Sequence, residues 1–448
     1  MAKLDGIEHS TAPEDLVCYG FDASYVKPAS ASMVAWPKST DEVSSIMRHA
    51  SAHRLAVVGR GAGTGMTAGS VPTEGSIVMS FEKMNSILEV DSGNMTALVE
   101  PGVINGNLQG ELRKLGLFYP PDPASLNFCT LGGNVAENAG GPRAVKYGVT
   151  RDYVMQMEAV LSSGKVITAG VKTYKGVVGY DLCRLLIGSE GTLAAITRIL
   201  LKTLPLPEEV TTLLVSFADI GSAGKAVAGV MASGIIPRTL EIMDRGAIDA
   251  VESYRPSGLP SDAEALLLIE LDGHPATIQQ EAGRVVDICQ GLRGNVRQAV
   301  GEEDREKLWE ARRIVSPALH HLNMNKINED VVVPRTRIPE MLIYLSELSE
   351  KSGIKIVNFG HAGDGNIHIN IMSAKGDEEE YARATGLVRE IFRKVLELEG
   401  TISGEHGVGK TKAAYMDMEV RESEMELMRG IKRLFDPRGI LNPGKIFQ

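Results

Sequence analysis

The spacing of apolar residues near position 360 predicts a β-hairpin. Residues 355–359 and 367–371 are apolar runs of strand length, and the glycines and aspartate between them are typical of a turn. We expect His361 and His368 to lie on the two arms of this hairpin, where their imidazole rings can converge on one point. The hairpin is therefore a candidate site for a ligand that two histidines bind.

The pattern in the N-terminal part predicts short strands separated by glycine-rich loops. A capping box at 39–42 is followed by apolar residues at helical spacing, and a short buried strand at 55–58 runs into a glycine-rich loop. Further strands are expected at 76–80, 87–90 and 97–99. Because the loop precedes a strand and not a helix, it does not fit the Rossmann fingerprint.

Three glycine-rich segments lie in this part of the chain, at 59–70, 130–141 and 188–193. The first can turn consecutive backbone N–H groups inward to form a nest for phosphate oxygens, and Arg60 adds a positive charge. The second is typical of a short helix framed by glycine pairs, and a stiff proline-rich arm at 119–125 precedes it. Together the segments favour a bound cofactor. A glycine loop that only turns a tight corner is the alternative.

The periodicity changes after a proline-punctuated connector at 204–207. Strand and helix patterns then alternate in an order that fits a ferredoxin-like antiparallel sheet. The expected elements are strands at 212–217, 240–243 and 266–271 and helices around 227–231, 278–286, 387–396 and 428–434. The connector therefore predicts a boundary between two domains of different architecture.

The composition is that of an ordinary globular chain. Of the 448 residues, 43% are hydrophobic and 23% are charged, which suffices for two or three domains with cores of their own. The net charge of −10 argues against a nucleic-acid or anionic-membrane surface, because such surfaces need clustered Lys and Arg. No apolar run approaches the roughly 20 residues that span a bilayer, and the first residues lack a signal-peptide pattern. We expect a cytoplasmic protein, peripheral to a membrane at most through a partner.

A second segment with candidate metal ligands lies at 403–409, where Glu405 and His406 stand side by side among glycines. Glycines let the backbone approach a ligand closely. Imidazole and carboxylate groups bind divalent metals such as zinc at about 2.0–2.2 Å. Together with His361 and His368, this segment favours a metal site. The alternative is that the two histidines only cap a hairpin, since short motifs are often coincidental.

Two basic residues upstream of the hairpin are candidates for binding an acid. Arg312 can hold a carboxylate with the two-pronged edge of its guanidinium, and Lys326 can hold it as a point charge. An arginine on an amphipathic helix more often faces solvent, so a solvated helix face is the alternative for Arg312.

These motifs occur in an order that resembles the flavoproteins of the vanillyl-alcohol-oxidase type. Within that family, the chain resembles the branch that contains D-lactate dehydrogenase, D-2-hydroxyglutarate dehydrogenase and the D-type subunit of glycolate oxidase. The resemblance covers about residues 36–447, and the motifs specific to the branch are the histidine hairpin and the Glu405–His406 pair. The segments that carry it are 59–70, 120–125, 130–141 with 146–148, 188–193, 360–368 and 403–409.

The resemblance implies an α+β fold, with a two-subdomain FAD-binding domain and a ferredoxin-like cap domain. We expect the FAD-binding domain at 1–205, the substrate-binding cap at 206–414, and a C-terminal helical tail at 415–448 that returns to the FAD domain. The residues expected to contact FAD are Arg60, Gly61, Ala62, Gly63, Thr64, Gly65, Pro121, Asp122, Gly132, Gly133, Asn134, Asn138, Gly141, Glu190, Gly191, Ile196 and Asn442. Some members attach FAD covalently through a histidine near the first glycine loop. Because residues 59–70 include no histidine, we expect non-covalent FAD.

The resemblance also implies the chemistry, which is oxidation of a D-2-hydroxy acid such as D-lactate, D-2-hydroxyglutarate or glycolate to the 2-oxo acid. The expected metal, zinc, would lower the pKa of the substrate hydroxyl, and the hydride would pass to flavin N5. His406 is the candidate general base, because imidazole titrates near the operating pH. The expected metal ligands are His361, His368 and Glu405, and the expected substrate-binding residues are Arg312, Ser316, Lys326 and Asn370.

The reduced flavin would then need an electron acceptor. The sequence has no motif for nicotinamide or for clustered iron, so an electron-transferring flavoprotein, a quinone or an iron–sulfur partner subunit is implied. A homodimer is one candidate assembly. Two other functions stay open, namely a metal-dependent hydrolase whose glycine loops hold a nucleotide and a flavin-binding subunit of a larger electron-transfer complex.

Overall fold

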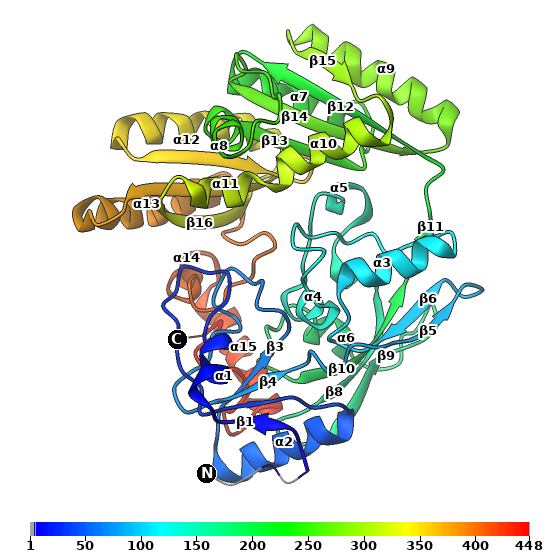
Figure 1. The fold of residues 1–448 in the computed structure, drawn as a ribbon, viewed down its shortest axis with the longest axis vertical. Coiled ribbons are helices and arrows are strands. Elements are labelled where there is room, and N and C mark those ends of the chain that lie inside the picture. Colours follow the sequence, from blue (N-terminus) through cyan, green and yellow to red (C-terminus); the bar gives the residue numbers. More distant parts are fainter. Residues whose placement is uncertain (1–3, 5, 448) are drawn as a thin grey trace. The chain divides into compact units, whose positions relative to one another are not determined.

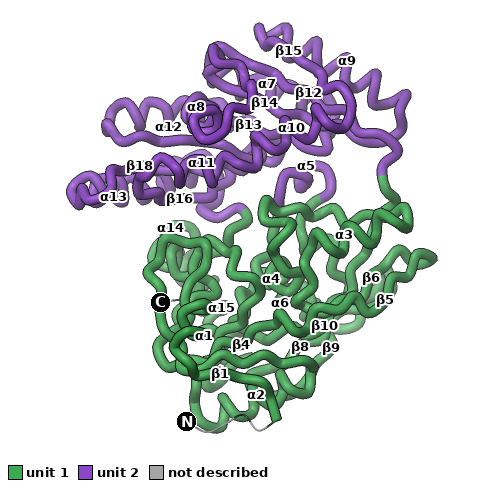
Figure 2. The backbone as a smooth tube through the Cα atoms, viewed as in Figure 1, with its two compact units in different colours: residues 1–140, 148–206, 405–448 green, residues 141–147, 207–404 purple. Residues whose placement is uncertain are grey.

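A computed structural model describes residue 4 and residues 6–447 of the chain (Figure 1). The chain forms two compact units (Figure 2). Unit 1 contains Met1–Gly140, Gly148–Leu206 and Glu405–Gln448, and unit 2 contains Gly141–Tyr147 and Pro207–Gly404. Unit 1 therefore resumes at Glu405, earlier than the expected tail at 415. A short segment at 141–147, expected within the first domain, belongs to unit 2.

The N-terminal sheet of unit 1 joins segments that are far apart in sequence. Its strands are β1 (His9–Ser10), β2 (Met33–Ala35), β4 (Ile77–Ser80) and β3 (Val57–Arg60), in that order, and β2 and β3 both run parallel to β4. Helix α2 (Thr40–His53) packs its apolar side on this sheet, with Ile46 and Met47 fully buried. The Ser39 side chain accepts the Glu42 N–H at its start, which confirms the predicted cap.

The second sheet of unit 1 is antiparallel and was only partly predicted. Its order is β5 (Ile87–Asp91), β6 (Thr96–Val99), β10 (Ala195–Lys202), β8 (Val154–Val160) and β9 (Val166–Gly170). The sequence analysis identified β5 and β6 but did not identify β8 or β9. The remaining elements are α1 (Pro13–Cys18), α3 (Asn105–Lys114), β7 (Leu117–Phe118), α4 (Leu131–Glu137), α6 (Leu182–Leu186), β11 (Leu204–Pro205), α14 (Met416–Glu419) and α15 (Glu422–Phe435). Helix α4 ends before the expected residue 141 because Asn138 adopts a left-handed conformation with φ of 54°.

Unit 2 is built on one seven-stranded antiparallel sheet, which confirms the predicted antiparallel cap (Figure 1). The strand order does not follow the sequence, because the last strands of the unit pair with β13 in its middle. The order is β15 (Asn295–Gln298), β12 (Glu209–Phe217), β14 (Ala265–Gly273), β13 (Thr239–Asp244), β17 (Lys355–Gly360), β18 (Asn366–Ala374) and β16 (Met324–Val332). The β17–β18 pair is the predicted histidine hairpin.

The helices of unit 2 leave part of one sheet face polar. Helices α8 (Arg245–Tyr254), α10 (Gly301–Arg313) and α11 (Val315–His321) bury Met243, Leu268 and Phe359 on that face. Glu241 is two residues from Met243 on β13, and His368 pairs with Phe359. Both side chains therefore point to this face of the sheet. The other helices that pack on the sheet are α7 (Ile220–Ala232), α9 (Pro275–Gly291), α12 (Ile338–Ser352) and α13 (Glu378–Glu397). The polar part of the face is the candidate site.

The short helix α5 (Ala144–Tyr147) is held on unit 2 by hydrogen bonds to Asp272. Lys146 Nζ lies 2.5 Å from Asp272 Oδ1, and the Tyr147 hydroxyl donates to Asp272 Oδ2 at 2.8 Å. These contacts explain why this segment belongs to unit 2. Among the described residues, no helix combines the length and the apolar character needed to cross a membrane.

Candidate functional site

The two hairpin histidines meet as predicted, although from slightly different places. His368 lies within β18, but β17 ends at Gly360, so His361 opens the turn and is not on the arm of the hairpin. The Nε2 atoms of the two rings are 3.4 Å apart, and both residues are buried. Two nitrogen ligands of a tetrahedral zinc ion, each about 2.0–2.1 Å from the metal, would stand about 3.3 Å apart. The two rings therefore have the separation of a metal-ligand pair.

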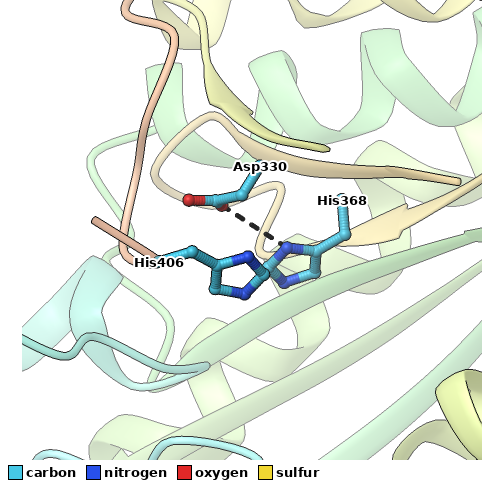
Figure 3. A group of neighbouring side chains, drawn as sticks. All are labelled: Asp330, His368 and His406. Atoms are coloured by element: carbon cyan, nitrogen blue, oxygen red, sulfur yellow. Dashed lines mark ion pairs between the residues drawn. The ribbon is translucent and has the colours of Figure 1, made fainter. Parts of the chain in front are cut away.

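Each histidine has a carboxylate behind its other ring nitrogen. His361 Nδ1 donates to Glu241 at 2.8 Å and 3.0 Å, and His368 Nδ1 lies 3.4 Å from Asp330 Oδ1 (Figure 3). A carboxylate can only accept from Nδ1, which leaves the Nε2 lone pair of His361 available for a ligand. This carboxylate–histidine arrangement is the usual support of a metal ligand. The sequence analysis missed Glu241, a charge among apolar residues of β13, and Asp330, which lies among other polar residues of β16.

The segment that carries Glu405 and His406 is anchored to Asp330, the carboxylate beside His368. The N–H of Gly404 donates to Asp330 Oδ2 at 2.9 Å, and the Asn366 side chain donates to Asp330 Oδ1 at 2.5 Å. Because Glu405 follows Gly404 directly, this hydrogen bond holds the start of the Glu405–His406 segment at Asp330. His361, His368 and Glu405 form one group whose ligand atoms lie within 4.8 Å of one another, and Asp330, His368 and His406 form a second such group (Figure 3). Two imidazoles and one carboxylate are a donor set that fits zinc.

Arg312 on α10 shares a carboxylate with His361. It is 7% exposed, its guanidinium lies over the Phe359 ring, and its Nη2 is 2.6 Å from Glu241 Oε2. Neither its Nε nor its Nη2 donates a hydrogen bond to the described residues, so the contact of Nη2 with Glu241 is an ion pair. Burial alone would raise the pKa of Glu241, but its interactions with His361 and Arg312 outweigh it and hold that pKa below its usual value. Arg312 thus offers an unused, buried N–H to an anion.

Lys326 and Ser316 lie together, and the contact of Asn370 with a substrate stays a prediction. Lys326 Nζ donates to Ser316 Oγ at 2.8 Å, and burial lowers the pKa of Lys326 to about 8. Asn370 is fully buried in β18, where its amide donates to the Val357 and His368 carbonyls and accepts from Asn328. These bonds use the Asn370 amide within the sheet. Asn370 therefore links β18 to β16 and β17 and contacts the backbone carbonyl of the neighbouring His368.

In unit 1, the first glycine loop presents unused backbone donors. The N–H groups of Gly61, Ala62, Gly63, Thr64 and Gly65 donate to no acceptor within the described part of the chain. Ala62 is exposed and the other four residues are half-buried, so these consecutive N–H groups are available to a ligand that accepts hydrogen bonds. Arg60 is buried beneath this loop. Its Nη1 donates to the Phe21 carbonyl at 2.6 Å, and a Cβ added at Gly63 would be 2.3 Å from its Nη2.

Asn442 lies at the edge of the same glycine-rich region. Its amide donates to the Gly69 and Glu190 carbonyls, and its Oδ1 has no hydrogen-bond partner among the described residues. An acceptor left open beside the unpaired N–H groups fits the donors and acceptors of a flavin nucleotide. The FAD contact expected of Glu190 stays a prediction, and its two carboxylate oxygens accept the N–H groups of Val408 and Gly409 at 2.7 Å. Glu190 holds the 407–409 loop.

The other residues expected to contact FAD are spread over several elements. Asn134 and Asn138 make internal hydrogen bonds, with Asn105 and with the Arg151 N–H. Gly132 is packed so closely on Pro101 that a Cβ would lie 2.5 Å from that ring. Ile196 is buried within β10. Pro121, Asp122, Gly133 and Gly191 lie in unit 1 and Gly141 in unit 2, and their contact with FAD stays a prediction.

Two family descriptions match the chain. "FAD linked oxidases, C-terminal domain" matches residues 206–446, and "FAD binding domain" matches residues 31–170. Two solved structures have the same fold at low identity. They are p-cresol methylhydroxylase with substrate bound (TM-score 0.81, 17% identity, 98% of this chain and 93% of that one) and 4-ethylphenol oxidase from Gulosibacter chungangensis (TM-score 0.80, 18% identity, 98% and 94%).

Curated relatives match almost the whole chain. A glycolate oxidase subunit GlcD from Bacillus subtilis is 44% identical over 96% of this chain and 92% of its own. A D-lactate dehydrogenase from Archaeoglobus fulgidus is 37% identical over 99% and 98%, and a D-2-hydroxyglutarate dehydrogenase from Stutzerimonas stutzeri is 32% identical over 98% and 95%. The chain therefore belongs to the FAD-linked oxidase family, with the fold of the vanillyl-alcohol-oxidase-type flavoproteins.

Proposed function

We propose that this protein is an FAD-dependent dehydrogenase that oxidises a D-2-hydroxy acid to the 2-oxo acid. The observation that carries the proposal is the arrangement around Glu241. The imidazole of His361, through Nδ1, and the guanidinium of Arg312, through Nη2, share the Glu241 carboxylate. A 2-hydroxy acid needs both partners, because a metal ligand set can bind its hydroxyl and a cation can bind its carboxylate.

The residues present fit both groups that the reaction needs. FAD would be held by the unpaired N–H groups of residues 61–65 and by Asn442, and a divalent metal, zinc, by His361, His368 and Glu405. When bound, the flavin supplies a hydride acceptor, and the metal supplies positive charge that lowers the pKa of the substrate hydroxyl. The absence of histidine from residues 59–70 supports non-covalent FAD.

The chain's own residues bind the acid and move its proton. Arg312 holds the carboxylate through its Nε edge, and Lys326, steadied by Ser316, adds a second positive charge. A ring nitrogen of His406 accepts the hydroxyl proton as the α-hydride leaves. Arg312 is buried and Lys326 is half-buried, which strengthens their interactions with an anion.

The cation pair favours an acid with more than one carboxylate. Arg312 and Lys326 are both partly desolvated, and each needs an anionic partner more than an exposed cation would. Because relatives are named for glycolate, D-lactate and D-2-hydroxyglutarate, all three acids are candidate substrates. Relatives described as a subunit support electron transfer to a separate protein, either an electron-transferring flavoprotein or an iron–sulfur subunit, or to a quinone.

The absorbance spectrum of the purified protein tests this proposal. Anaerobic addition of D-lactate, D-2-hydroxyglutarate or glycolate should bleach the flavin band with one acid well ahead of the others, and an added oxidant should restore it. The L-acid of the best substrate is the matched control and should leave the band unchanged. A protein that binds FAD but is reduced by none of the three acids would rule out the proposed substrates. Denaturation followed by filtration should release all the flavin into the filtrate.

A further inference from the structure

Glu241 occupies an unusual position for a glutamate. It lies in the middle of β13, its side chain is fully buried, and its neighbours on the strand, Leu240 and Ile242, are core residues. β13 pairs with β17 through Ile242 opposite Gly360 and Met243 opposite Phe359. Continued by one residue, this antiparallel register puts Glu241 opposite His361. The sheet therefore fixes where the Glu241 carboxylate can reach.

The two oxygens of Glu241 contact two groups with different proposed roles. Oε1 accepts from His361 Nδ1 at 2.8 Å, and Oε2 lies 2.6 Å from Arg312 Nη2. His361 is a proposed metal ligand, and Arg312 is the proposed clamp for the substrate carboxylate. One side chain therefore supports one member of each set.

We propose that Glu241 is a positioning residue shared by the metal site and the acid-binding site. This inference rests on the proposed function. Glu241 keeps the proton of His361 on Nδ1, so that Nε2 faces the metal position. It also fixes the guanidinium of Arg312 by Nη2, so that the Nε edge faces the acid.

Asp330 provides the matched comparison. It supports the other histidine, with its Oδ1 3.4 Å from His368 Nδ1, and it also accepts from Gly404 and Asn366. The ion pair of Arg312 is made with Glu241, on a different strand. Asp330 should therefore affect metal binding alone, whereas Glu241 should affect both sites.

Two binding measurements separate these roles without turnover. The first is the zinc Kd of the metal-stripped, FAD-loaded protein, measured by competition with a chromophoric chelator. The second is the Kd of oxalate on the same metal-stripped protein, measured from the change in the flavin spectrum. Oxalate is a carboxylate probe that has no hydroxyl to oxidise, and metal removal prevents it from chelating zinc at the site.

The decisive variant is Glu241→Asp, which keeps the charge but shortens the side chain so that it no longer reaches both partners. We expect zinc affinity to fall about 10–100-fold, as is usual when the partner of a metal ligand is lost. We expect oxalate affinity to fall at least about threefold through the loosened guanidinium. Asp330→Asn should weaken zinc similarly and leave oxalate within about twofold, since the arginine keeps its partner.

Glu241→Gln distinguishes positioning from simple charge balance. If Glu241 only offset the charge of Arg312, removing the negative charge would tighten oxalate binding. A shared positioning role predicts weaker oxalate binding, because the NH2 group of a glutamine would replace one of the two oxygens and face an N–H donor of His361 or Arg312. Tighter oxalate binding in Glu241→Gln, or unchanged oxalate binding in Glu241→Asp, would overturn the inference.

Arg312→Met tests the same link from the other side, should the Glu241 variants fail to fold. If Glu241 serves both sites, releasing it from Arg312 should shift the zinc Kd by at least about threefold, although Arg312 is no metal ligand. An unchanged zinc Kd would refute the shared role. Failure of the inference differs from failure of the proposed function, because a protein reduced by a D-2-hydroxy acid can still show independent sites.

Discussion

The glycine loop of unit 1 offers backbone groups to a ligand, whereas the histidine pair of unit 2 offers side chains. At residues 61–65 the ligand-binding groups belong to the backbone, and five N–H donors have no acceptor in the described chain. At His361 and His368 they are side chains, each held by a buried carboxylate from another strand. A backbone site depends on chain conformation, so conformational changes should damage it. A side-chain site depends on a few atoms, so single-group deletions should damage it.

The largest effect is expected from removing a metal ligand. His368→Ala should abolish zinc binding, measured by metal analysis, and lower turnover about a thousandfold or more, because several kcal/mol of charge stabilisation are lost. The FAD content should stay unchanged, since the unpaired N–H groups of residues 61–65 are untouched. His274→Ala, at a position outside the site, is the control and should keep both metal and activity. Normal turnover without bound metal would remove the metal from the proposed function.

Removing the proposed base should have a smaller effect on rate and none on either cofactor. His406→Ala is expected to lower kcat about 10²–10⁴-fold, the usual contribution of a general base. Flavin content and zinc content should remain those of the unchanged protein. The measurement is anaerobic single-turnover reduction of the flavin at saturating acid. Full-speed reduction would show that another group takes the proton.

A methyl group in the backbone site should affect the other cofactor. In Gly63→Ala the new Cβ would lie 2.3 Å from Arg60 Nη2, at a residue whose φ is +69°. We expect FAD affinity to fall about tenfold or more, because strain of about 1–3 kcal/mol is added at the loop. Zinc binding should be unchanged. Gly75→Ala is the matched control, since Gly75 has φ of +75° but no atom within 4 Å of its Cβ position.

If Gly75→Ala lowers FAD affinity as much as Gly63→Ala, the loss comes from backbone strain in general and the specific role of the 61–65 loop is wrong. Equal stability losses with unequal FAD losses would support the role. Both quantities follow from thermal unfolding with and without added FAD.

The smallest effect concerns the charge of Lys326. Its pKa is lowered by burial to about 8, so the amine is charged below that pH and binds an acid best there. The KM for the acid should rise severalfold as the pH passes from about 7 to 9, and Lys326→Met should remove this dependence. Because the folded pKa lies below the unfolded value, burying the charge lowers stability at neutral pH, and this cost fades as the pH rises from about 8 toward 10.5. A pH-independent KM in the unchanged protein would exclude Lys326 from acid binding.

The sequence by itself identified the parts of the protein that depend on local pattern. The cap of α2, the β17–β18 hairpin and the antiparallel sheet of unit 2 follow from apolar spacing and turn residues over a few positions. The glycine loop was recognised for the same reason, because its binding groups are consecutive along the chain. Strands β8 and β9 were missed, although they pair with each other as a local hairpin; only the pairing of β8 with β10 joins residues that are distant in sequence.

Only the tertiary structure decided which side chains support the candidate site. Nothing in the local sequence of β13 or β16 marks Glu241 and Asp330, and they become the partners of His361 and His368 only when β13, β16 and the hairpin align in one sheet. The sheet likewise ties Asn370 to Asn328, and the fold of unit 1 assigns Glu190 to the 407–409 loop. A periodic pattern reports which face of an element is buried, but a buried charge is explained by its partner, and that partner is chosen by long-range pairing.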